Sequence, residues 1–325
     1  MPATTATTTY SANDLTYGVE IECGIDHRLC PNLRIGGHGC GFPVAELPAP
    51  GGRNWRADHD GSVHVENRTA VEFVSPVLKG GEGFDNIKAT VDQIKAWGGR
   101  VNQSCGLHVH VHFPTDSIEA LRRLYRLVSR VEEGIYCSTG TPSRANGGWC
   151  RSIKKAKGIR WNGLSVANST EKRNLMFDNQ TDLFSNRYHL LNVTNYLQGR
   201  QPTVEFRAFS GTLNADKINA WVRICVSLVE MALNGINPAW EVSERTLLHV
   251  PEGGQPETRG QSAVNYLIFY LWRQAHGGRK FGKIDHDRYT TRRAMNTLRE
   301  LATRHDQRAG LNPITVPNLS STSDE

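Results

Sequence analysis

Three short segments of this chain place a charged or imidazole side chain at every second residue. Within each segment, apolar residues alternate strictly with the polar ones, which predicts a β-strand with one apolar and one polar face. The segments are Gly18–Glu22, Gly106–His112 and Thr203–Arg207. An ordinary half-buried strand turns its polar face to water. Carboxylates and imidazoles gathered on one sheet face instead indicate a site for divalent cations and phosphate.

The composition limits the kind of protein in which such a site would be found. Hydrophobic residues make up 38% of the 325 residues, and the formal net charge is +6. No apolar run approaches the roughly 18 residues of a membrane span, and the Thr- and Ala-rich N-terminus lacks the features of a secretory signal. The chain has seven cysteines, which is an odd number and a low density for its length, and this favours reduced thiols over a disulfide framework. We therefore expect a cytoplasmic chain that acts on anionic substrates.

The distribution of residue types along the chain predicts one large domain. We expect a disordered leader over residues 1–15, a single catalytic domain over 16–310 and a tail over 311–325. Residues 24–56 are irregular and rich in Gly and Pro, which indicates an insertion folded onto the site. Residues 139–172 mix basic residues with Gly, Asn and Ser, which predicts a mobile basic loop.

Hairpins interleaved with helices favour an α+β fold. A strand over residues 16–23 opens the ordered region, and apolar residues at helical spacing predict the helices. The expected hairpins join residues 62–66 with 69–75 and residues 190–196 with 203–209. The expected helices cover residues 84–97, 118–135, 214–233, 262–274 and 288–305.

Glu20 and Glu22 are the first candidate metal ligands. They would lie about 6.5–7 Å apart along one strand face, which is too far for one ion but suits two neighbouring ions. Carboxylates with an added imidazole favour Mg²⁺ or Mn²⁺ over zinc. Of the histidines at 108, 110 and 112, we expect His108 and His110 to reach the site.

Other polar residues have both a functional and a structural interpretation. Glu205 and Arg207 could bind a metal and a phosphoryl group, or they could form an ordinary salt bridge. Asp58, Asp60 and Ser62 stand where a turn would place Asp and Ser in any case.

The cysteines suggest one further metal site. Cys23, Cys30, His38 and Cys40 could bind a structural zinc ion, but their spacing lacks the compact paired Cys-x-x-Cys form, and we expect no zinc there. The remaining cysteines are expected to be small buried hydrophobes. They are Cys105, Cys137, Cys150 and Cys225.

The order of the motifs resembles that of a known family. The motifs are Gly-Val-Glu-Ile-Glu (18–22), Asp60-Gly61-Ser62, Val-Glu-Phe-Val-Ser-Pro (71–76), Gly-Leu-His-Val-His-Val (106–111), Arg187 with Asn192, and Thr-Val-Glu-Phe-Arg (203–207). Over residues 16–233 they resemble the amidoligase family, which is grouped with glutamine synthetase and glutamate–cysteine ligase as carboxylate–amine ligases. The resemblance implies a curved, mainly antiparallel sheet of the glutamine synthetase catalytic-domain type, with helices on the convex face.

The same resemblance implies ATP, two divalent ions and a set of site residues. Arg187 would hold an acceptor carboxylate or a phosphate, and Asp60 and Arg207 complete the catalytic candidates. The candidate metal ligands are Glu20, Glu22, Glu72, His108 and Glu205. The candidate nucleotide contacts are His110, Arg207, Ser62 and Lys154.

We therefore expect an ATP-dependent ligase that joins a small-molecule or peptide carboxylate to an amine through an acyl phosphate. Two alternatives remain open. A zinc hydrolase could be built on His108 and His110, but it would leave the glutamates unused. A nucleic-acid-binding module could use the basic loop at 144–160, although an acidic strand face would repel phosphates. The sequence does not identify the acid or the amine.

Overall fold

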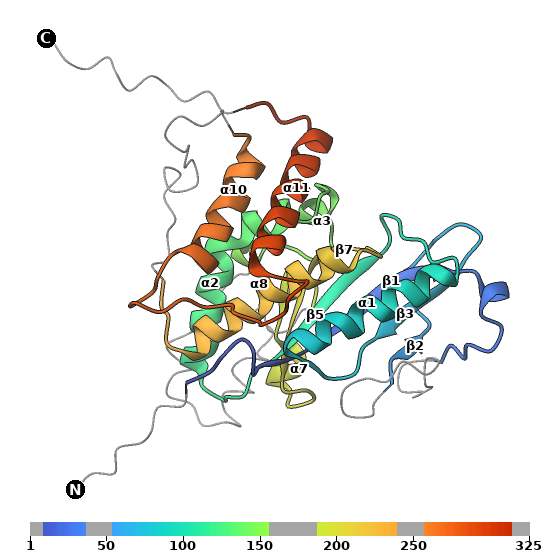
Figure 1. Cartoon of the computed structure of the whole chain (residues 1–325), viewed down its shortest axis with the longest axis horizontal. Coiled ribbons are helices and arrows are strands. Elements are labelled where there is room, and N and C mark those ends of the chain that lie inside the picture. The colour runs from blue at the N-terminus through green and yellow to red at the C-terminus, as the bar shows by residue number, and fades with distance from the viewer. Residues whose placement is uncertain (1–8, 37–53, 156–186, 239–256, 314–325) are drawn as a thin grey trace, which may run out of the picture.

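A single antiparallel sheet organises the molecule. The computed structural model describes residues 9–36, 54–155, 187–238 and 257–313 (Figure 1). The strand order is β2-β3-β1-β5-β7-β6, and β4 pairs with the beginning of β1. The strands are β1 (Thr16–Ile25), β2 (Arg56–Asp58), β3 (Thr69–Val74), β4 (Leu78–Lys79), β5 (Gly106–His112), β6 (Leu191–Asn192) and β7 (Thr203–Ser210).

The alternation along each central strand gives the sheet one apolar face. Val19 and Ile21 of β1, and Val109 and Val111 of β5, are fully buried in the core. The glutamates of β1 and the histidines of β5 alternate with them and therefore lie on the opposite face. The predicted α+β class with an antiparallel sheet is confirmed.

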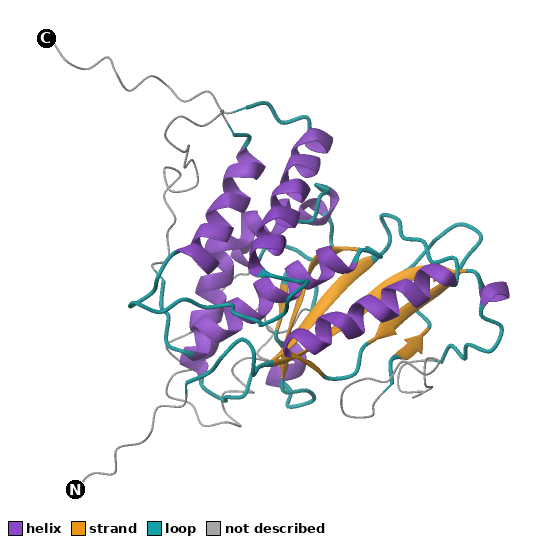
Figure 2. Cartoon of the chain, in the orientation of Figure 1, coloured by secondary structure: helices purple, strands orange, loops and turns teal. Residues whose placement is uncertain are grey.

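The helices fall into two layers (Figure 2). Helices α1, α2 and α8 pack beside the sheet, and α10 and α11 pack outside α2 and α8. The ring of Trp221 on α8 stacks on Phe209 of β7, with 4.9 Å between centroids. The long helices are α1 (Gly80–Ala96), α2 (Ile118–Cys137), α8 (Ala215–Leu233), α10 (Arg259–Ile268) and α11 (Thr291–Ala309). Short helical turns are η1 (His27–Leu29), α3 (Ser143–Asn146), η2 (Ile153–Lys155), α7 (Thr194–Leu197) and the π-helical η3 (Phe269–Arg273).

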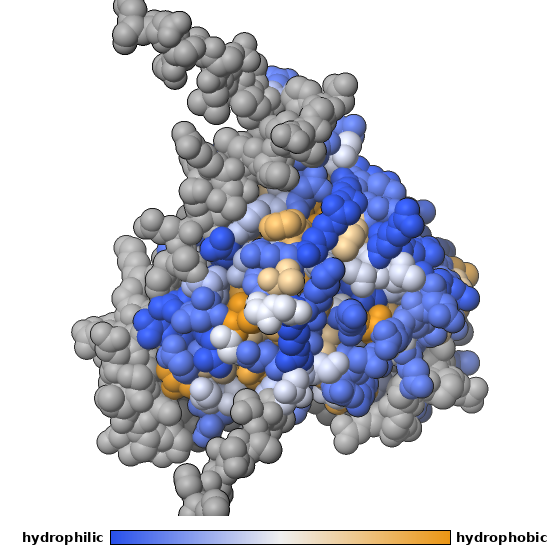
Figure 3. All heavy atoms as spheres, turned by 60° about the vertical axis from the view of Figure 1, so that its left-hand side comes forward, coloured by the Kyte–Doolittle hydropathy of each residue, from blue (hydrophilic) through white to orange (hydrophobic). Residues whose placement is uncertain are grey.

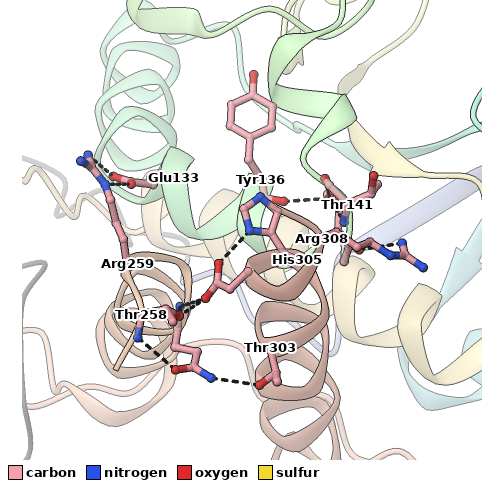
Figure 4. A network of polar contacts seen from close by, with 12 residues as sticks. Glu133, Tyr136, Thr141, Thr258, Arg259, Thr303, His305 and Arg308 are labelled. Carbon is pink, nitrogen blue, oxygen red and sulfur yellow. Dashed lines mark hydrogen bonds and ion pairs between the residues drawn. The ribbon is translucent and has the colours of Figure 1, made fainter. Parts of the chain in front are cut away.

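A buried carboxylate fastens α10 to α11 (Figure 4). Asp306 of α11 accepts hydrogen bonds from the Thr258 hydroxyl and from the Gln261 backbone N–H, the latter at 2.9 Å. Its other oxygen lies 2.9 Å from Nδ1 of His305. A Cβ atom at Gly260 would lie 1.9 Å from the Asp306 carboxylate, so only glycine allows this approach. A free backbone N–H group at the N-terminus of α10 thus finds its hydrogen-bond acceptor on the neighbouring helix α11.

The first predicted hairpin is wrong in one arm. On the side of β3 that faces away from β1, the antiparallel partner is β2 at residues 56–58, and residues 62–66 form turns and irregular backbone rather than a strand. The backbone of His64 bonds to Ser104 Oγ and Asn102 Nδ2 instead of to a ladder. The second predicted hairpin is present, but β6 is only two residues long.

Parts of the chain that were expected to be disordered are packed. Ala12 and Leu15, within the expected leader, are buried, and Tyr10 exchanges hydrogen bonds with Asn234. At the start of the expected basic loop, Cys150 and Ile153 are also buried. The remainder of that loop, over 156–172, and most of the expected tail lie outside the described residues.

The molecular face seen in Figure 3 is mostly hydrophilic, with small scattered hydrophobic patches. Among the helices that the structure describes, none is long and apolar enough to cross a membrane. The six described cysteines are buried and form no disulfide, as expected, and Cys40 lies outside the described residues.

Candidate functional site

The register of the sheet brings the polar residues of four strands into one row. Residues that lie directly opposite each other on antiparallel strands have Cβ atoms roughly 4.5–5.5 Å apart, so their side chains touch. The opposed pairs are Glu22 with Glu72, Glu20 with His108, and His110 with Glu205. We call these six residues and Arg207 the carboxylate row.

His108 lies at the centre of the carboxylate row. Its Nδ1 atom is 2.9 Å from Glu20 Oε2 and 3.5 Å from Glu205 Oε1, and its Nε2 atom is 3.5 Å from Glu22 Oε1. The Nε2 atom of His110 lies 3.0 Å from Glu20 Oε1. Since His108, Glu22 and Glu205 are buried, water screens these charges only weakly.

The pKa values of the residues in the row are shifted in different directions. Burial, together with the nearby Glu20 and Glu22 carboxylates, raises the pKa of Glu72 to about 9. Burial favours the neutral ring of His110, but Glu20 and Glu205 outweigh it and raise the pKa of His110 to about 9. Despite burial, the two histidines hold the pKa of Glu20 well below its usual range. A carboxyl group that stays protonated near neutral pH indicates that the row lacks positive charge.

A β-bulge in β7 places Arg207 in the row. Leu107 pairs with Phe209 and Val109 pairs with Phe206, so Arg207 and Ala208 together oppose one residue of β5. The bulge turns two carbonyl groups out of the ladder. Arg144 of α3 donates to both of them, from Nη2 to Arg207 O at 2.6 Å and from Nε to Ala208 O at 3.3 Å.

Glu205 is held from two sides. One oxygen pairs with Arg207 Nη1, and the other accepts a hydrogen bond from Asn192 Nδ2 at 2.6 Å. Despite its burial, Arg207 has a raised pKa because Glu205 and Glu20 surround it. Its Nε atom is buried and has no hydrogen-bond partner in the described part of the chain. This guanidinium therefore keeps a donor for a further group.

Asp60 adjoins the row at the end formed by Glu22 and Glu72. A Glu22 oxygen accepts a hydrogen bond from the Gly106 backbone N–H. Asp60 lies beside Glu22 and Glu72, and the backbone N–H and hydroxyl of Ser62 each donate to its Oδ1 at 2.7 Å. Ser62 thus orients Asp60.

Three overlapping groups could hold metal ions. Glu20 and Glu72 each belong to two groups, so the positions are adjacent rather than separate. Hard divalent cations suit these oxygen-rich sets. The groups are Glu20, His110 and Glu205; Glu20, Glu72 and His108; and Glu22, Asp60 and Glu72. No cysteine belongs to any group among the described residues, and His38 and Cys40 of the suggested zinc site lie outside them.

Two predicted site residues contact other parts of the chain. Arg187 is exposed and places its guanidinium 5.5 Å from the Tyr188 ring centroid. Lys154 is also exposed and lies near Glu132 of α2, where its charge opposes the rise in the pKa of Glu132 that burial causes. Neither residue forms an ion pair with the row in the structure as described.

Sequence reasoning missed the roles of Arg144 and Asn192. Asn192 carried a signal because it stood among the family motifs. Arg144 carried no such signal in the sequence, because its role is to donate hydrogen bonds to carbonyl groups of the bulge in β7. Asp58 lies opposite Glu72, but Arg56 pairs with it at 2.6 Å, so its charge is balanced locally.

The comparisons with known proteins agree with the motifs. A family model described as "Putative amidoligase enzyme" matches residues 46–229. No curated protein matches the chain. The match begins after β1 and runs from before β2 into α8.

Two solved structures are distantly similar. One is a bifunctional glutathione synthetase from Pasteurella multocida, with 9% identity, a TM-score of 0.43, and coverage of 93% of this chain and 50% of that one. The other is the ligase PafA, solved in complex with the prokaryotic ubiquitin-like protein Pup, with 11% identity, a TM-score of 0.42, and coverage of 92% and 65%. The chain spans less than two thirds of either structure. Because the family model covers more than half of its residues, this chain belongs to the amidoligase family.

Proposed function

We propose that this chain is an ATP-dependent carboxylate–amine ligase. Its family membership supports an amide-forming reaction. The observation that carries the proposal is the carboxylate row, in which Glu20 and Glu72 are each shared between two potential metal positions. A buried carboxyl with a pKa of about 9 has a strong demand for cations, and phosphoryl transfer from ATP needs cations at the transferred group.

The metal ions would be Mg²⁺ or Mn²⁺. Glu20, Glu22, Glu72, His108 and Glu205 would hold them, and they fit because they offer carboxylate oxygens with a single imidazole. When bound, such ions neutralise charge on phosphoryl oxygens.

The reaction would proceed in two steps. A carboxylate oxygen of the acid bonds to the γ-phosphorus of ATP while the bond to the bridging oxygen breaks, and ADP leaves. The amine nitrogen then attacks the acyl carbon and loses a proton, and inorganic phosphate leaves. Water must be excluded in between, since it would hydrolyse the acyl phosphate.

Arg207 would stabilise the transferring phosphoryl group. Its planar fork matches phosphate oxygens, and the bulge and Glu205 fix its position. His110, whose pKa the Glu20 and Glu205 carboxylates raise to about 9 in the metal-free row despite burial, would contact the nucleotide phosphates. Asp60 would take part in catalysis at the end of the row formed by Glu22 and Glu72. Ser62 would contact the nucleotide, and its hydroxyl orients Asp60.

Arg187 and Lys154 flank residues 156–186, which lie outside the described structure. Their contacts with phosphate or an acceptor carboxylate therefore stay predictions. The same holds for a fold of the glutamine synthetase catalytic-domain type and for a single catalytic domain, which we extend to include residues 9–15 because these pack against the core.

The alternatives gain no support from the site. His108 and His110 do not share a potential metal position in the described residues, as a zinc hydrolase would need. Arg144, at the start of the basic loop, donates to the bulge carbonyls of β7, beside an acidic row that would repel nucleic-acid phosphates.

Product analysis tests the proposal. With ATP, Mg²⁺, hydroxylamine and a panel of carboxylic acids, the chain should form a hydroxamate and release ADP and phosphate in equal amounts. Glu205→Gln should abolish both products, and Lys95→Met, on the exposed face of α1, should leave them unchanged. Release of AMP and pyrophosphate would exclude the acyl-phosphate mechanism.

A further inference from the structure

An open pocket of about 430 Å³ adjoins the carboxylate row where β5 begins and β7 ends. Arg144 and Ser210 line it on the side of the sheet, and Lys217 and Arg308 line it on the side of α8 and α11. None of the described residues that line the pocket is acidic. The pocket is therefore cationic, whereas the adjoining row is anionic.

Lys217, in the first turn of α8, is the most confined of these cations. It is half-buried, and burial together with Arg304 and Arg308 lowers its pKa. Within the described residues no carboxylate forms an ion pair with its ammonium group, although Asp216 and Glu300 line the neighbouring pocket that Lys217 also borders. Lys217 and Arg308 thus line this pocket together with no acidic residue, and an anionic ligand would stabilise them there.

Two further groups give the pocket donors that are not used within the protein. The Ser210 hydroxyl is buried and has no partner in the structure as described. Arg144 uses Nε and one Nη2 hydrogen for the bulge carbonyls and also contacts the Cys150 thiol, but a guanidinium has five N–H donors, so further donors remain.

Arg144 also connects the pocket to the row. A Cβ atom at Gly106 would lie 3.2 Å from Arg144 Nη2 and 3.2 Å from Glu22 Oε2, so the guanidinium and the carboxylate flank the same glycine. A short ligand could thus have one end at the metal positions near Glu22 and the other end in the pocket.

We propose that this pocket binds a second carboxylate of the acid substrate, and that the preferred acid is a short dicarboxylate or an acidic amino acid. This inference rests on the proposed ligase function, which supplies the reacting carboxylate at the row. The remote carboxylate pairs with Lys217 and Arg308 and accepts hydrogen bonds from Arg144 and Ser210.

Direct binding tests the pocket without turnover. Calorimetry with Mg²⁺ and without ATP would measure the dissociation constants of glutarate and butyrate. Butyrate has a similar length but lacks the second carboxylate. Glutarate should bind at least about tenfold more tightly. Lys217→Met should weaken glutarate binding by about 10–100-fold, the range for hydrogen bonds to charged groups, and leave butyrate unchanged.

Two control variants keep this result interpretable. Arg308→Met changes an exposed residue that lines the same pocket, so it should weaken glutarate binding even if Lys217→Met folds poorly. Lys95→Met, outside the pocket, should have no effect. Equal binding of glutarate and butyrate by the wild-type chain, or glutarate binding unaffected by both pocket variants, would overturn the inference.

The hydroxamate assay separates this inference from the proposed function. If glutarate binds as expected but no acid yields a hydroxamate, the ligase function fails and the pocket stands. If hydroxamates form equally from glutarate and butyrate, and Lys217→Met leaves both KM values unchanged, the ligase function stands and the pocket assignment fails. If Lys217→Met weakens only the binding of a non-hydrolysable ATP analogue, the pocket serves nucleotide phosphate and the inference is overturned.

Discussion

Two of the regions in which the described residues bury carboxylates differ in how they satisfy the charge. Between α10 and α11, the single carboxylate of Asp306 receives hydrogen bonds from Thr258 and from the helix N-terminus and pairs with His305. In the carboxylate row, four glutamates share two imidazoles and one guanidinium. No described residue donates a hydrogen bond to Glu72, whose pKa rises to about 9. The helical network is complete within the protein, whereas we propose that added cations complete the row.

We infer that this difference separates a buried charge that stabilises the fold from one that serves a ligand. A satisfied carboxylate contributes stability and loses it when a donor is removed. A crowded carboxylate costs stability, and removal of its charge relieves the crowding. The two regions should therefore respond in opposite directions to the same kind of substitution.

The largest expected effect is on turnover. Glu20→Ala and Glu205→Ala should each reduce hydroxamate formation at least about 10³-fold, because each removes a potential metal ligand from the row. Asp306→Asn, the matched change in the helical network, should leave kcat within about twofold. Steady-state kinetics under saturating ATP and Mg²⁺ would measure both, and a glutamate variant with near-normal kcat would remove that residue from the site.

Arg207→Lys should produce the next largest effect. Lysine keeps the charge but loses the planar fork, so kcat should fall about 10²–10³-fold with a smaller change in the KM for ATP. Thermal unfolding should change little, since a cation still faces Glu205. Wild-type kcat in this variant would assign Arg207 to an ordinary salt bridge.

Stability should change with opposite sign in the two regions. Asp306→Ala removes the partner of the Thr258 hydroxyl and of the Gln261 backbone N–H, and we expect a loss of about 2–4 kcal/mol. Glu72→Gln in metal-free buffer at pH 8 should instead gain about 1 kcal/mol, or roughly 2 °C in Tm for a chain of this size. Denaturant and thermal unfolding would measure the two variants, and destabilisation by Glu72→Gln would contradict the crowding of the row.

The smallest effect is the pH dependence of the metal-free protein. The pKa of Glu72 rises from 4.5 to about 9 on folding, so the cost of its charge appears above pH 4.5 and is complete above pH 9. The pKa of His110 rises from 6.5 to about 9, so its favourable contribution is present below pH 6.5 and lost by pH 9. Both changes lower stability between pH 6.5 and 9. Tm measured in EDTA should fall over this range, and less steeply in Glu72→Gln.

The sequence predicts the parts of this structure that depend on local periodicity. Strict alternation locates β1, β5 and β7 and assigns Glu20, His108 and Glu205 to the polar face. Helical spacing locates the long helices because their apolar faces repeat within one segment. The family motifs add Glu72, which no isolated pattern would connect to β1.

The remaining features depend on contacts between distant segments. The choice of β2 over residues 62–66 as the partner of β3 follows from bonds between His64 and the loop at 102–104. The bulge at Arg207 and Ala208, and with it the role of Arg144, arises from a register shift that alternation does not encode. The order at Tyr10 likewise depends on Asn234.

The measurement that tests the central claim most directly is the stoichiometry of Mn²⁺ on the carboxylate row, by electron paramagnetic resonance titration of the metal-free chain. The account predicts about two Mn²⁺ per chain in the wild type and in Asp306→Asn, with binding lost in the Glu20→Gln/Glu205→Gln double variant. Mg²⁺ should compete for the same positions. Absence of Mn²⁺ binding by the wild type, or unchanged stoichiometry in the double variant, would contradict the account.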